Sequence, residues 1–242
     1  IVVNEAYRIV QLKDGAEISC HAVLIATGAS FHTLKMPGAD ALTGAGIYYG
    51  AAYTEAMNYK DGDVFVVGGA NSAAQGAIYL SQFARKVTVL VRAHEPTASK
   101  HLVDAMQSNA KIEILTDTDL LEVRGSAALE GIVIKNTKSD EIKTFDASAL
   151  FVFIGVRPQS QLVADLVIRS EKGYVFTGPD LMKDKNPPPN WTLERDPFLL
   201  ETSTPGIFAA GDVRYGTSHR VASAVGEGAI AYALMKEYLK SL

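Results

Sequence analysis

The chain has 242 residues, of which 48% are hydrophobic and 21% charged, and its formal net charge is −4. This is the composition of an ordinary globular protein, long enough for one large core or two modest ones. It lacks the concentrated basic face of a nucleic-acid-binding domain, and no apolar run reaches the ~18 residues of a membrane span. With Cys20 as the single cysteine, no disulfide or thiolate metal cluster can form within it. We therefore predict no metal site and a cytoplasmic location.

The first 60 residues predict two strands followed by turns. The strands are expected at 1–12 and 17–27, and the second contains the continuous apolar run Ala22–Ala26, which is typical of a buried strand. Turn signals follow at Pro37-Gly38 and at Gly44-Ala45-Gly46.

A strand–turn–helix–strand pattern begins at residue 63. A buried strand at 64–67 leads through a glycine-containing turn into a helix that extends to about Phe83, and a second apolar strand follows at 87–91. This predicts a βαβ unit, in which ligands bind at the carboxyl ends of the strands.

The rest of the chain alternates between further parallel elements and a meander. A helix is expected at 98–108 and a strand at 112–115, and alternating segments then predict a three-stranded meander. Its strands are expected at 120–124, 129–136 and 142–145. Later elements are a strand at 150–155, a proline-rich loop at 178–200, a strand at 206–212 and a last helix at 220–239.

The turn Gly68–Ala73 is a near match to the dinucleotide-binding pattern G-x-G-x-x-A. Gly68 suits the tight turn and Ala73 suits close helix–strand packing, although Ala70 stands where a second glycine usually approaches the pyrophosphate. The diphosphate is expected at the helix N-terminus. The alternative is a strand–helix turn that binds no ligand. The predicted nicotinamide-nucleotide residues here are Gly68, Gly69, Ala70, Asn71, Ser72 and Ala73.

Arg92, after the second strand of this unit, bears on the choice of cofactor. An NAD site usually places Asp or Glu there for the ribose 2′-OH, whereas an arginine suits the 2′-phosphate of NADP. We predict NADP, with NAD as the alternative and with His94 and Lys100 as assisting cations. Otherwise Arg92 is an ordinary solvated side chain.

The segment 202–212 delivers an acid to the end of a strand. Asp212, beside Gly211, can accept a hydrogen bond from a flavin ribityl hydroxyl. The N-terminus of the last helix can stabilise negative charge on the flavin pyrimidine ring. The alternative is an aspartate that caps the end of the strand. The predicted FAD-binding residues are Thr27, Gly28, Gly211, Asp212, Arg220, Val221 and Ala222.

These segments resemble the low-molecular-weight thioredoxin reductase family of the pyridine nucleotide-disulfide oxidoreductases. The resemblance spans essentially the whole chain and is carried by a few segments, namely Ala26–Gly28, 64–78, Leu150–Gly155, Thr204–Asp212 and Arg220–Ala222. It is closest to a branch often fused to regulatory or cyclic-nucleotide-binding domains, which has similar tail segments. The resemblance adds Ile154 and Gly155 to the NADP site.

The resemblance also implies an α/β fold class with two Rossmann-like, three-layer dinucleotide-binding domains and a β-meander. The FAD domain is expected to be discontinuous, comprising 1–32 and 149–242, with the NAD(P)H domain at 33–148 between them. Hinges are expected near 29–36 and 146–150. A homodimer that binds FAD and NADP is implied as well.

The sequence departs from this family in three respects. The opening βαβ unit of the FAD domain is absent and the chain starts with Ile, so we expect an N-terminally truncated FAD domain. Gly50 and Tyr53 stand at the redox Cys-x-x-Cys positions, so no catalytic residue is assigned and direct thiol–disulfide exchange is not expected. Ala93 and Thr97 replace arginines of the 2′-phosphate cluster.

Three functions follow as hypotheses. The first is an FAD-dependent NAD(P)H oxidoreductase whose electron acceptor is unknown, with a quinone, oxygen, ferredoxin or an external disulfide as options. The second is a nucleotide-binding redox sensor or regulatory module, fused to a signalling domain and without sustained turnover. The third is a domain that binds the nicotinamide nucleotide alone.

Overall fold

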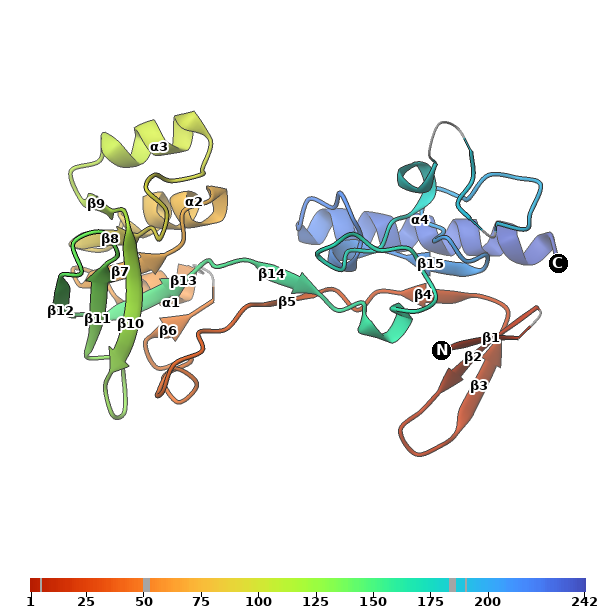
Figure 1. The fold of residues 1–242 in the computed structure, drawn as a ribbon, viewed down its shortest axis with the longest axis horizontal. Helices are drawn as coiled ribbons and strands as arrows, with labels where there is room; N and C mark the ends of the chain where they lie inside the picture. The colour runs from red at the N-terminus through yellow and green to blue at the C-terminus, as the bar shows by residue number, and fades with distance from the viewer. Residues whose placement is uncertain (5, 50–52, 183–185, 190) are drawn as a thin grey trace. The chain divides into compact units, whose positions relative to one another are not determined.

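The computed structural model describes residues 1–4, 6–49, 53–182, 186–189 and 191–242. The chain forms two compact units (Figure 1). Unit 1 comprises Ile1–Ser30 and Val156–Leu242, and unit 2 comprises Phe31–Gly155. Strands β5 (Ala29–Phe31) and β14 (Val156–Pro158) pair with each other where the chain passes between the units.

Unit 2 is built on a five-stranded parallel sheet. The strand order is β6-β13-β7-β8-β9. The strands comprise Ile47–Tyr48, Ala149–Val152, Asp63–Val67, Lys86–Leu90 and Ile112–Leu115, respectively. Among the described residues, this unit has the helices α1 (Tyr53–Asn58), α2 (Asn71–Leu80) and α3 (Lys100–Gln107).

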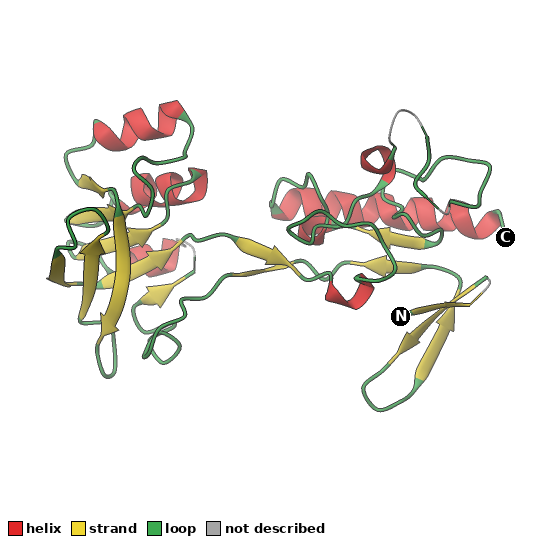
Figure 2. Ribbon diagram, in the orientation of Figure 1, coloured by secondary structure: helices red, strands yellow, loops and turns green. Residues whose placement is uncertain are grey.

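The sheet of unit 2 is the middle of three layers. Val64 and Val66 point to the face covered by α2 and α3, while Phe65 points to the opposite face. That opposite face packs against a meander (Figure 2). The meander strands are β10 (Thr118–Arg124), β11 (Gly131–Asn136) and β12 (Ile142–Asp146). Because successive residues of a strand point to opposite faces, the apolar runs seen in the sequence bury both faces of the sheet.

Helix α2 ends earlier than the predicted Phe83. Its regular part ends at Leu80, and the N–H groups of Gln82 and Phe83 donate to the carbonyls of Tyr79 and Leu80 at 3.2 and 3.0 Å. These three-residue hydrogen bonds tighten the last turn into a narrower helix.

The parallel pair β15 (Ile207–Ala209) and β4 (Val23–Ile25) lies at the centre of unit 1. Apolar side chains cover both faces of this pair. Ile207 and Ala209 pack with residues of 163–175, while Phe208 packs with α4 (Val221–Lys240). Short 3₁₀ turns complete the unit at Gln161–Val163, Gly178–Leu181 and Gly211–Val213.

The described residues among the first twelve form two antiparallel strands instead of the single predicted strand. Strands β1 (Val2–Asn4) and β2 (Tyr7–Gln11) are antiparallel, and β3 (Glu17–Cys20) pairs with β2. Reversal between Asn4 and Tyr7 gives both segments a hydrogen-bonded partner, which one continuous strand would lack. Buried Arg8 on β2 donates to the carbonyl of Pro205 and to the hydroxyl of Tyr238.

The proline-rich region predicted as a loop at 178–200 contains a 3₁₀ turn, Gly178–Leu181, and ends in a buried ion pair. Glu201 has no exposed surface and accepts hydrogen bonds from Arg195 Nη1 at 2.7 Å and Nη2 at 3.1 Å. The backbone N–H groups of Phe198 and Gly206 donate to the same carboxylate, each at 3.0 Å. Trp191 Nε1 donates to the carbonyl of Arg195 at 2.7 Å, which anchors this end of the loop.

The boundary between the units falls later than the predicted start of the second FAD segment at 149. Strand β13 (Ala149–Val152) pairs with β6 and β7, and unit 2 continues to Gly155. Parallel pairing on both edges holds β13 within the sheet, so the strand groups with unit 2. The assignment of 1–32, 33–148 and 149–242 to particular cofactors stays a prediction.

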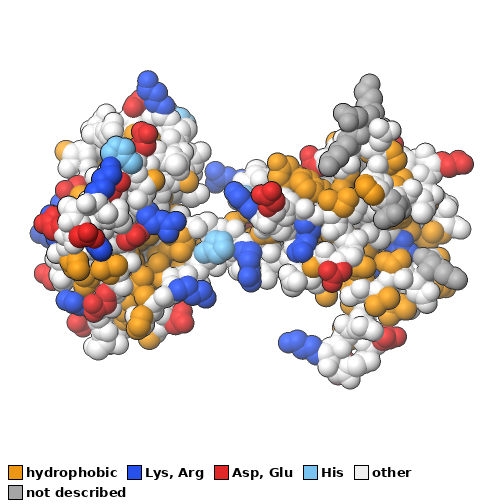
Figure 3. Space-filling view, in the orientation of Figure 1, with side chains coloured by type: hydrophobic (Ala, Val, Ile, Leu, Met, Phe, Trp, Pro, Cys, Tyr) orange, Lys and Arg blue, Asp and Glu red, His pale blue; other side chains and the backbone are white. Residues whose placement is uncertain are grey.

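The described residues meet the requirements of neither a membrane-spanning helix nor a metal centre. No helix in the described part of the chain has the length and apolar character needed to cross a bilayer. Among the same residues, His, Cys, Asp and Glu side chains do not gather in groups of three suited to a metal ion. Lys, Arg, Asp and Glu side chains are interspersed on the face of unit 2 seen in Figure 3.

Candidate nucleotide-binding sites

The turn after β7, predicted to begin the nicotinamide site, requires glycine at position 68. Gly68 has a φ of +140°, and a Cβ there would lie 2.5 Å from the carbonyl oxygen of Phe153 and 3.1 Å from the Cβ of Ala73. Phe153 itself donates its N–H to the carbonyl of Val67 at 2.8 Å. The ends of β7 and β13 therefore approach too closely for any side chain at this position.

The N-terminus of α2 follows this turn with no side-chain cap. Ala70 is the N-cap residue, and Ala70, Asn71 and Ser72 are all exposed. The unpaired N–H groups of a first helical turn can hold a diphosphate. Buried Ser99 Oγ, at the start of α3, has no hydrogen-bond partner among the described residues. An uncapped helix and an orphaned hydroxyl both fit a bound nucleotide.

The loop before α3 is attached to the glycine turn. The N–H groups of Thr97 and Ala98 donate to the carbonyl of Gly69 at 2.8 and 3.0 Å, and that of Ser99 donates to Asn71 Oδ1 at 2.8 Å. The N-termini of α2 and α3 are thereby held together. The Asn71 side-chain oxygen is used inside the protein, so its predicted contact with the nucleotide would involve its backbone.

Sheet order brings the other predicted nicotinamide-site residues to the same edge. Arg92 lies two residues after the end of β8, and Ile154 and Gly155 follow β13. Since β13, β7 and β8 are parallel neighbours, their carboxyl ends meet at one edge of the sheet. Arg92, Ile154 and Gly155 are all exposed there.

In unit 1 the predicted flavin residues meet in the same way. The register of β15 and β4 pairs Ile207 with Val23 and Ala209 with Ile25, so Thr27-Gly28 and Gly211-Asp212 follow adjacent strand ends. Thr27 Oγ1 donates to the carbonyl of Gln159, whose N–H donates to the carbonyl of Gly28 at 2.8 Å. Thr27 thus has a structural partner in addition to its predicted cofactor role.

Asp212 has a buried carboxylate oxygen without a hydrogen-bond donor among the described residues. This atom is Oδ1, and the imidazole Nδ1 of His219 lies 3.7 Å away from it, beyond hydrogen-bond distance. A buried carboxylate oxygen without a donor is costly. A flavin ribityl hydroxyl is a donor of the type this oxygen needs, so the residue fits FAD.

The start of α4 is open to solvent. Arg220 is the N-cap residue and supplies no side-chain cap, and Arg220, Val221 and Ala222 are all exposed. Val221 is the extreme case, with 83% of its surface exposed. The positive end of the helix is therefore accessible to an anionic group.

Glu227 was missed by the sequence analysis and organises the flavin turn. Its Oε2 accepts a hydrogen bond from the N–H of Gly211 at 2.7 Å, and Arg214 Nη2 donates to its Oε1 at 2.8 Å. Arg214 also donates to Thr177 Oγ1 at 2.9 Å. A signal was present, because Glu227 is the single charged residue between Val221 and Met235 on an otherwise apolar helix.

Glu227 gives the folded state an acid-sensitive contact. Burial acts to raise its pKa, but the hydrogen bonds from Arg214 and the Gly211 N–H, with the charge of Arg214, outweigh burial and bring the pKa below its ordinary value of 4.5. A lowered folded-state pKa means that the stabilisation is complete above the ordinary value and is lost as pH falls through the folded one.

We expect the stability difference between the wild type and Glu227→Gln to shrink as the pH is lowered below about 4.5. Urea unfolding between pH 7 and pH 3 measures this difference. Glu237→Gln, on the exposed side of the same helix, is the control and should show little pH-dependent difference. A gap between wild type and Glu227→Gln that stays constant across this range would contradict the expectation.

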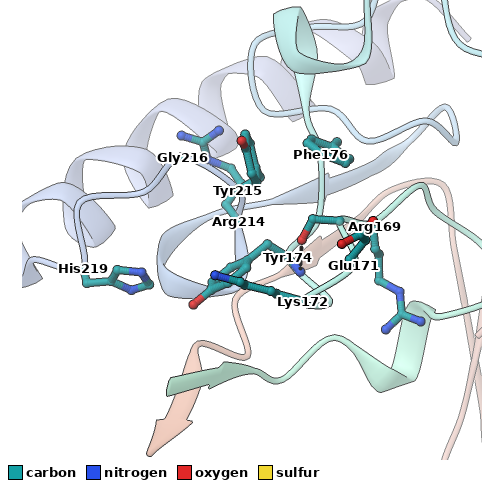
Figure 4. A pocket seen from close by; sticks show the side chains of 10 residues that line it. Arg169, Glu171, Lys172, Tyr174, Phe176, Arg214, Tyr215, Gly216 and His219 are labelled. Carbon is teal, nitrogen blue, oxygen red and sulfur yellow. Dashed lines mark hydrogen bonds between the residues drawn. The ribbon is translucent and has the colours of Figure 1, made fainter. Parts of the chain in front are cut away.

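A cavity of about 630 Å³ adjoins the flavin turn (Figure 4). The segment that joins Asp212 to α4 forms one wall, and residues 169–176 form the other. Two ring contacts shape it: Tyr174 meets His219 edge to face at 5.8 Å, and Phe176 lies 4.6 Å from Tyr215. Burial, and to a lesser extent the charge of Asp212, raise the pKa of the Tyr174 phenol above its ordinary value of 10.0. The cavity is lined by Arg214 and His219, which flank the candidate flavin residues Asp212 and Arg220 in the sequence.

The side chains at the two positions predicted to replace redox cysteines lie outside the part of the chain that the structure describes. Gly50 lies outside the described residues, and Tyr53 begins α1 with its side chain outside them.

Each unit contains parallel strands whose carboxyl ends carry the residues predicted to bind one of the two nucleotides. Residues 1–228 match the family model for pyridine nucleotide-disulphide oxidoreductases. The chain belongs to this family. Thioredoxin reductase family members use FAD and NADPH, and the likeness identifies an NAD(P)H-dependent flavoprotein oxidoreductase. The predicted α/β class with two Rossmann-like domains and the two cofactors are confirmed.

Three similar proteins illustrate the relationship. The chain is 34% identical to a thioredoxin reductase of Peptoclostridium litorale over 232 residues, covering 93% of this chain and 67% of the relative. It is 31% identical over 218 residues to a "34.2 kDa protein in rubredoxin operon" of Clostridium pasteurianum, covering 90% and 64%. The Lactococcus lactis thioredoxin reductase structure (FR conformation) superposes with a TM-score of 0.76 at 27% identity, covering 99% of this chain and 73% of that one. The chain thus spans about two thirds of the length of these curated relatives.

Proposed function

We propose that the protein oxidises NADPH and passes the electrons through FAD to an acceptor other than a disulfide formed within these 242 residues. The observation that carries the proposal is the buried, unpartnered Oδ1 of Asp212 at the end of β15. The uncapped α2 N-terminus behind Gly68 supports a separate nicotinamide site in unit 2. The single cysteine, Cys20, supports the exclusion of an internal disulfide.

Each site residue has a proposed role that follows from its place. The first-turn N–H groups at Ala70–Ala73 bind the NADPH diphosphate, and Arg92 faces the 2′-phosphate. Asp212 accepts a hydrogen bond from the flavin ribityl chain, and the α4 N-terminus at Arg220–Ala222 favours negative charge on the pyrimidine ring. A bound FAD would supply the redox chemistry that links NADPH to the acceptor, while the residues above would hold and orient the two nucleotides.

Glu227 and Arg214 act as positioning residues. By accepting the Gly211 N–H, Glu227 fixes the turn that presents Asp212, and its pairing with Arg214 neutralises the carboxylate. The negative charge available to the cofactor in this turn is therefore that of Asp212.

We expect Asp212→Ala to weaken FAD binding about 10- to 100-fold, the worth of one hydrogen bond to a charged group. The measurement is the flavin content of the purified full-length protein, followed by FAD titration. Asp165→Ala, at an exposed aspartate of the same unit, is the matched control and should keep its flavin. Equal flavin content in both variants would remove Asp212 from the FAD site and favour a domain that binds the nicotinamide nucleotide alone.

Turnover separates the enzyme from the sensor that the sequence also suggests. The full-length protein should bleach with NADPH in the absence of oxygen and oxidise NADPH steadily with at least one member of an acceptor panel. The panel should hold a quinone, oxygen, ferredoxin, an external disulfide and a rubredoxin, because one relative is named for a rubredoxin operon. Tight cofactor binding without turnover on any acceptor would favour the sensor. The expected homodimer and cytoplasmic location stay predictions.

A further inference from the structure

A histidine and a lysine side chain meet one carboxylate just beyond Arg92 in the sequence. His94 Nδ1 lies 3.0 Å from Asp117 Oδ2, and Lys138 Nζ lies 3.1 Å from the same oxygen. Lys138 Nζ also lies 2.8 Å from His94 Nδ1, although the two residues are 44 positions apart in the sequence. Lys138 comes from the turn between β11 and β12, so the meander contributes to the edge of the sheet where the nicotinamide site lies.

Backbone hydrogen bonds hold this arrangement in place. The N–H of Asp117 donates to the carbonyl of Ala93 at 3.0 Å, and the N–H of Thr137 donates to the carbonyl of Asp117 at 2.7 Å. The N–H of Lys138 donates to Asn136 Oδ1 at 3.0 Å. The loop after β8 and the meander turn are thus linked through Asp117, and Lys138 has a fixed backbone.

The Lys138 and His94 side chains of this cluster face solvent, whereas the carboxylate of Asp117 is largely covered. The side chain of Asp117 is 14% exposed, whereas those of Lys138 and His94 are 60% and 75% exposed. Hydrogen bonding from His94, and the hydrogen bond and charge of Lys138, lower the pKa of Asp117, so it is ionised near neutral pH and offsets one cation. Glu95 and Lys100, both exposed in the adjoining loop and helix start, carry opposite charges. With Arg92 the corner keeps a surplus positive charge.

We propose that Lys138, positioned by Asp117 and His94, binds the 2′-phosphate of NADPH together with Arg92 and so selects NADPH over NADH. This rests on the proposed nicotinamide site at Gly68–Ala73. In dinucleotide folds the ribose 2′ position lies at the end of the second strand, where β8 ends here. Phosphate is bound most strongly by several charged donors. The loop itself offers Ala93 and Thr97 as uncharged residues, so the second cation comes from the meander.

The test compares two nucleotide fragments that differ by the 2′-phosphate. Titration calorimetry with 2′,5′-ADP and with 5′-AMP is carried out on the full-length wild type and on Lys138→Gln, Lys138→Arg and Lys143→Gln. Lys143 is the control because it lies on the same hairpin and pairs with Glu141, away from the cluster. These titrations need no flavin turnover.

Lys138→Gln should weaken 2′,5′-ADP about 10-fold or more and leave 5′-AMP unchanged, because one hydrogen bond to a charged group is removed. Lys138→Arg should largely retain the preference, and Lys143→Gln should match the wild type. Equal losses for both fragments, or no loss in Lys138→Gln, would overturn the role of Lys138 while leaving the nicotinamide site intact. A wild type that binds neither fragment would overturn the nicotinamide site and this proposal together.

Discussion

Replacing Glu201 with alanine is expected to lower the free energy of unfolding by about 3–5 kcal/mol, because removing one partner of a buried ion pair leaves the other charge unpaired. The carboxylate has no exposed surface and accepts four hydrogen bonds, two from Arg195 and one each from the Phe198 and Gly206 N–H groups. Removing it strands a guanidinium that is 28% exposed, together with backbone donors inside unit 1.

Urea unfolding of the flavin-loaded protein measures this loss. Glu201→Gln keeps acceptor oxygen and shape while removing the charge, so it should lie between wild type and Glu201→Ala. Glu237→Ala removes an exposed partner of Lys240 and should change stability little. A Glu201→Ala loss as small as that of Glu237→Ala would show that the pair contributes no net stability.

Gly68→Ala is expected to destabilise the protein by about 2–5 kcal/mol and to abolish measurable nucleotide-fragment binding to unit 2. Strain at an unfavourable φ costs about 1–3 kcal/mol, and overpacking against the carbonyl of Phe153 costs about 1–3 kcal/mol more. Relief of the clash must separate the ends of β7 and β13, where the diphosphate is proposed to bind.

Gly44→Ala is the matched control for this prediction. Gly44 also belongs to unit 2 and has a φ of +82°, but a Cβ there meets no atom within 4 Å. It therefore carries the conformational strain without the clash and should keep fragment binding. Thermal unfolding measures the loss of stability, and 2′,5′-ADP titration measures the loss of fragment binding. Equal losses in the two variants would contradict the steric argument at position 68.

The local sequence pattern was sufficient to predict most of the strands and helices of unit 2. The apolar runs at 64–67 and 87–91 are strands β7 and β8, and the glycine turn between them opens α2 as expected. These segments are fixed by features within a few residues, such as apolar character, glycine placement and alanine-rich helix sequence. Strand β6 escaped notice because its two residues, Ile47–Tyr48, carry no period and become a strand only by pairing with β13.

The candidate site residues likewise fall into those that a local motif predicts and those that depend on distant contacts. Gly68 and Asp212 were found because each stands in a recognisable strand–turn–helix motif. Glu227 and Lys138 were not, because their partners lie far along the chain: Glu227 binds the Gly211 N–H 16 residues away and Lys138 meets His94 44 residues away. A single sequence records neither contact.

The sequence by itself determined the class of the protein, because two glycine turns after apolar strands and an acid after a third strand are local features that the chemistry of two dinucleotides requires. Tertiary structure decided how those turns are held. Parallel pairing brings the ends of β13, β7 and β8 to one edge, and a helix carboxylate fixes the Gly211 turn. The polar cluster of His94, Asp117 and Lys138 depends on a meander turn that only folding places beside the loop after β8, since charge interactions act through space and are independent of position along the chain.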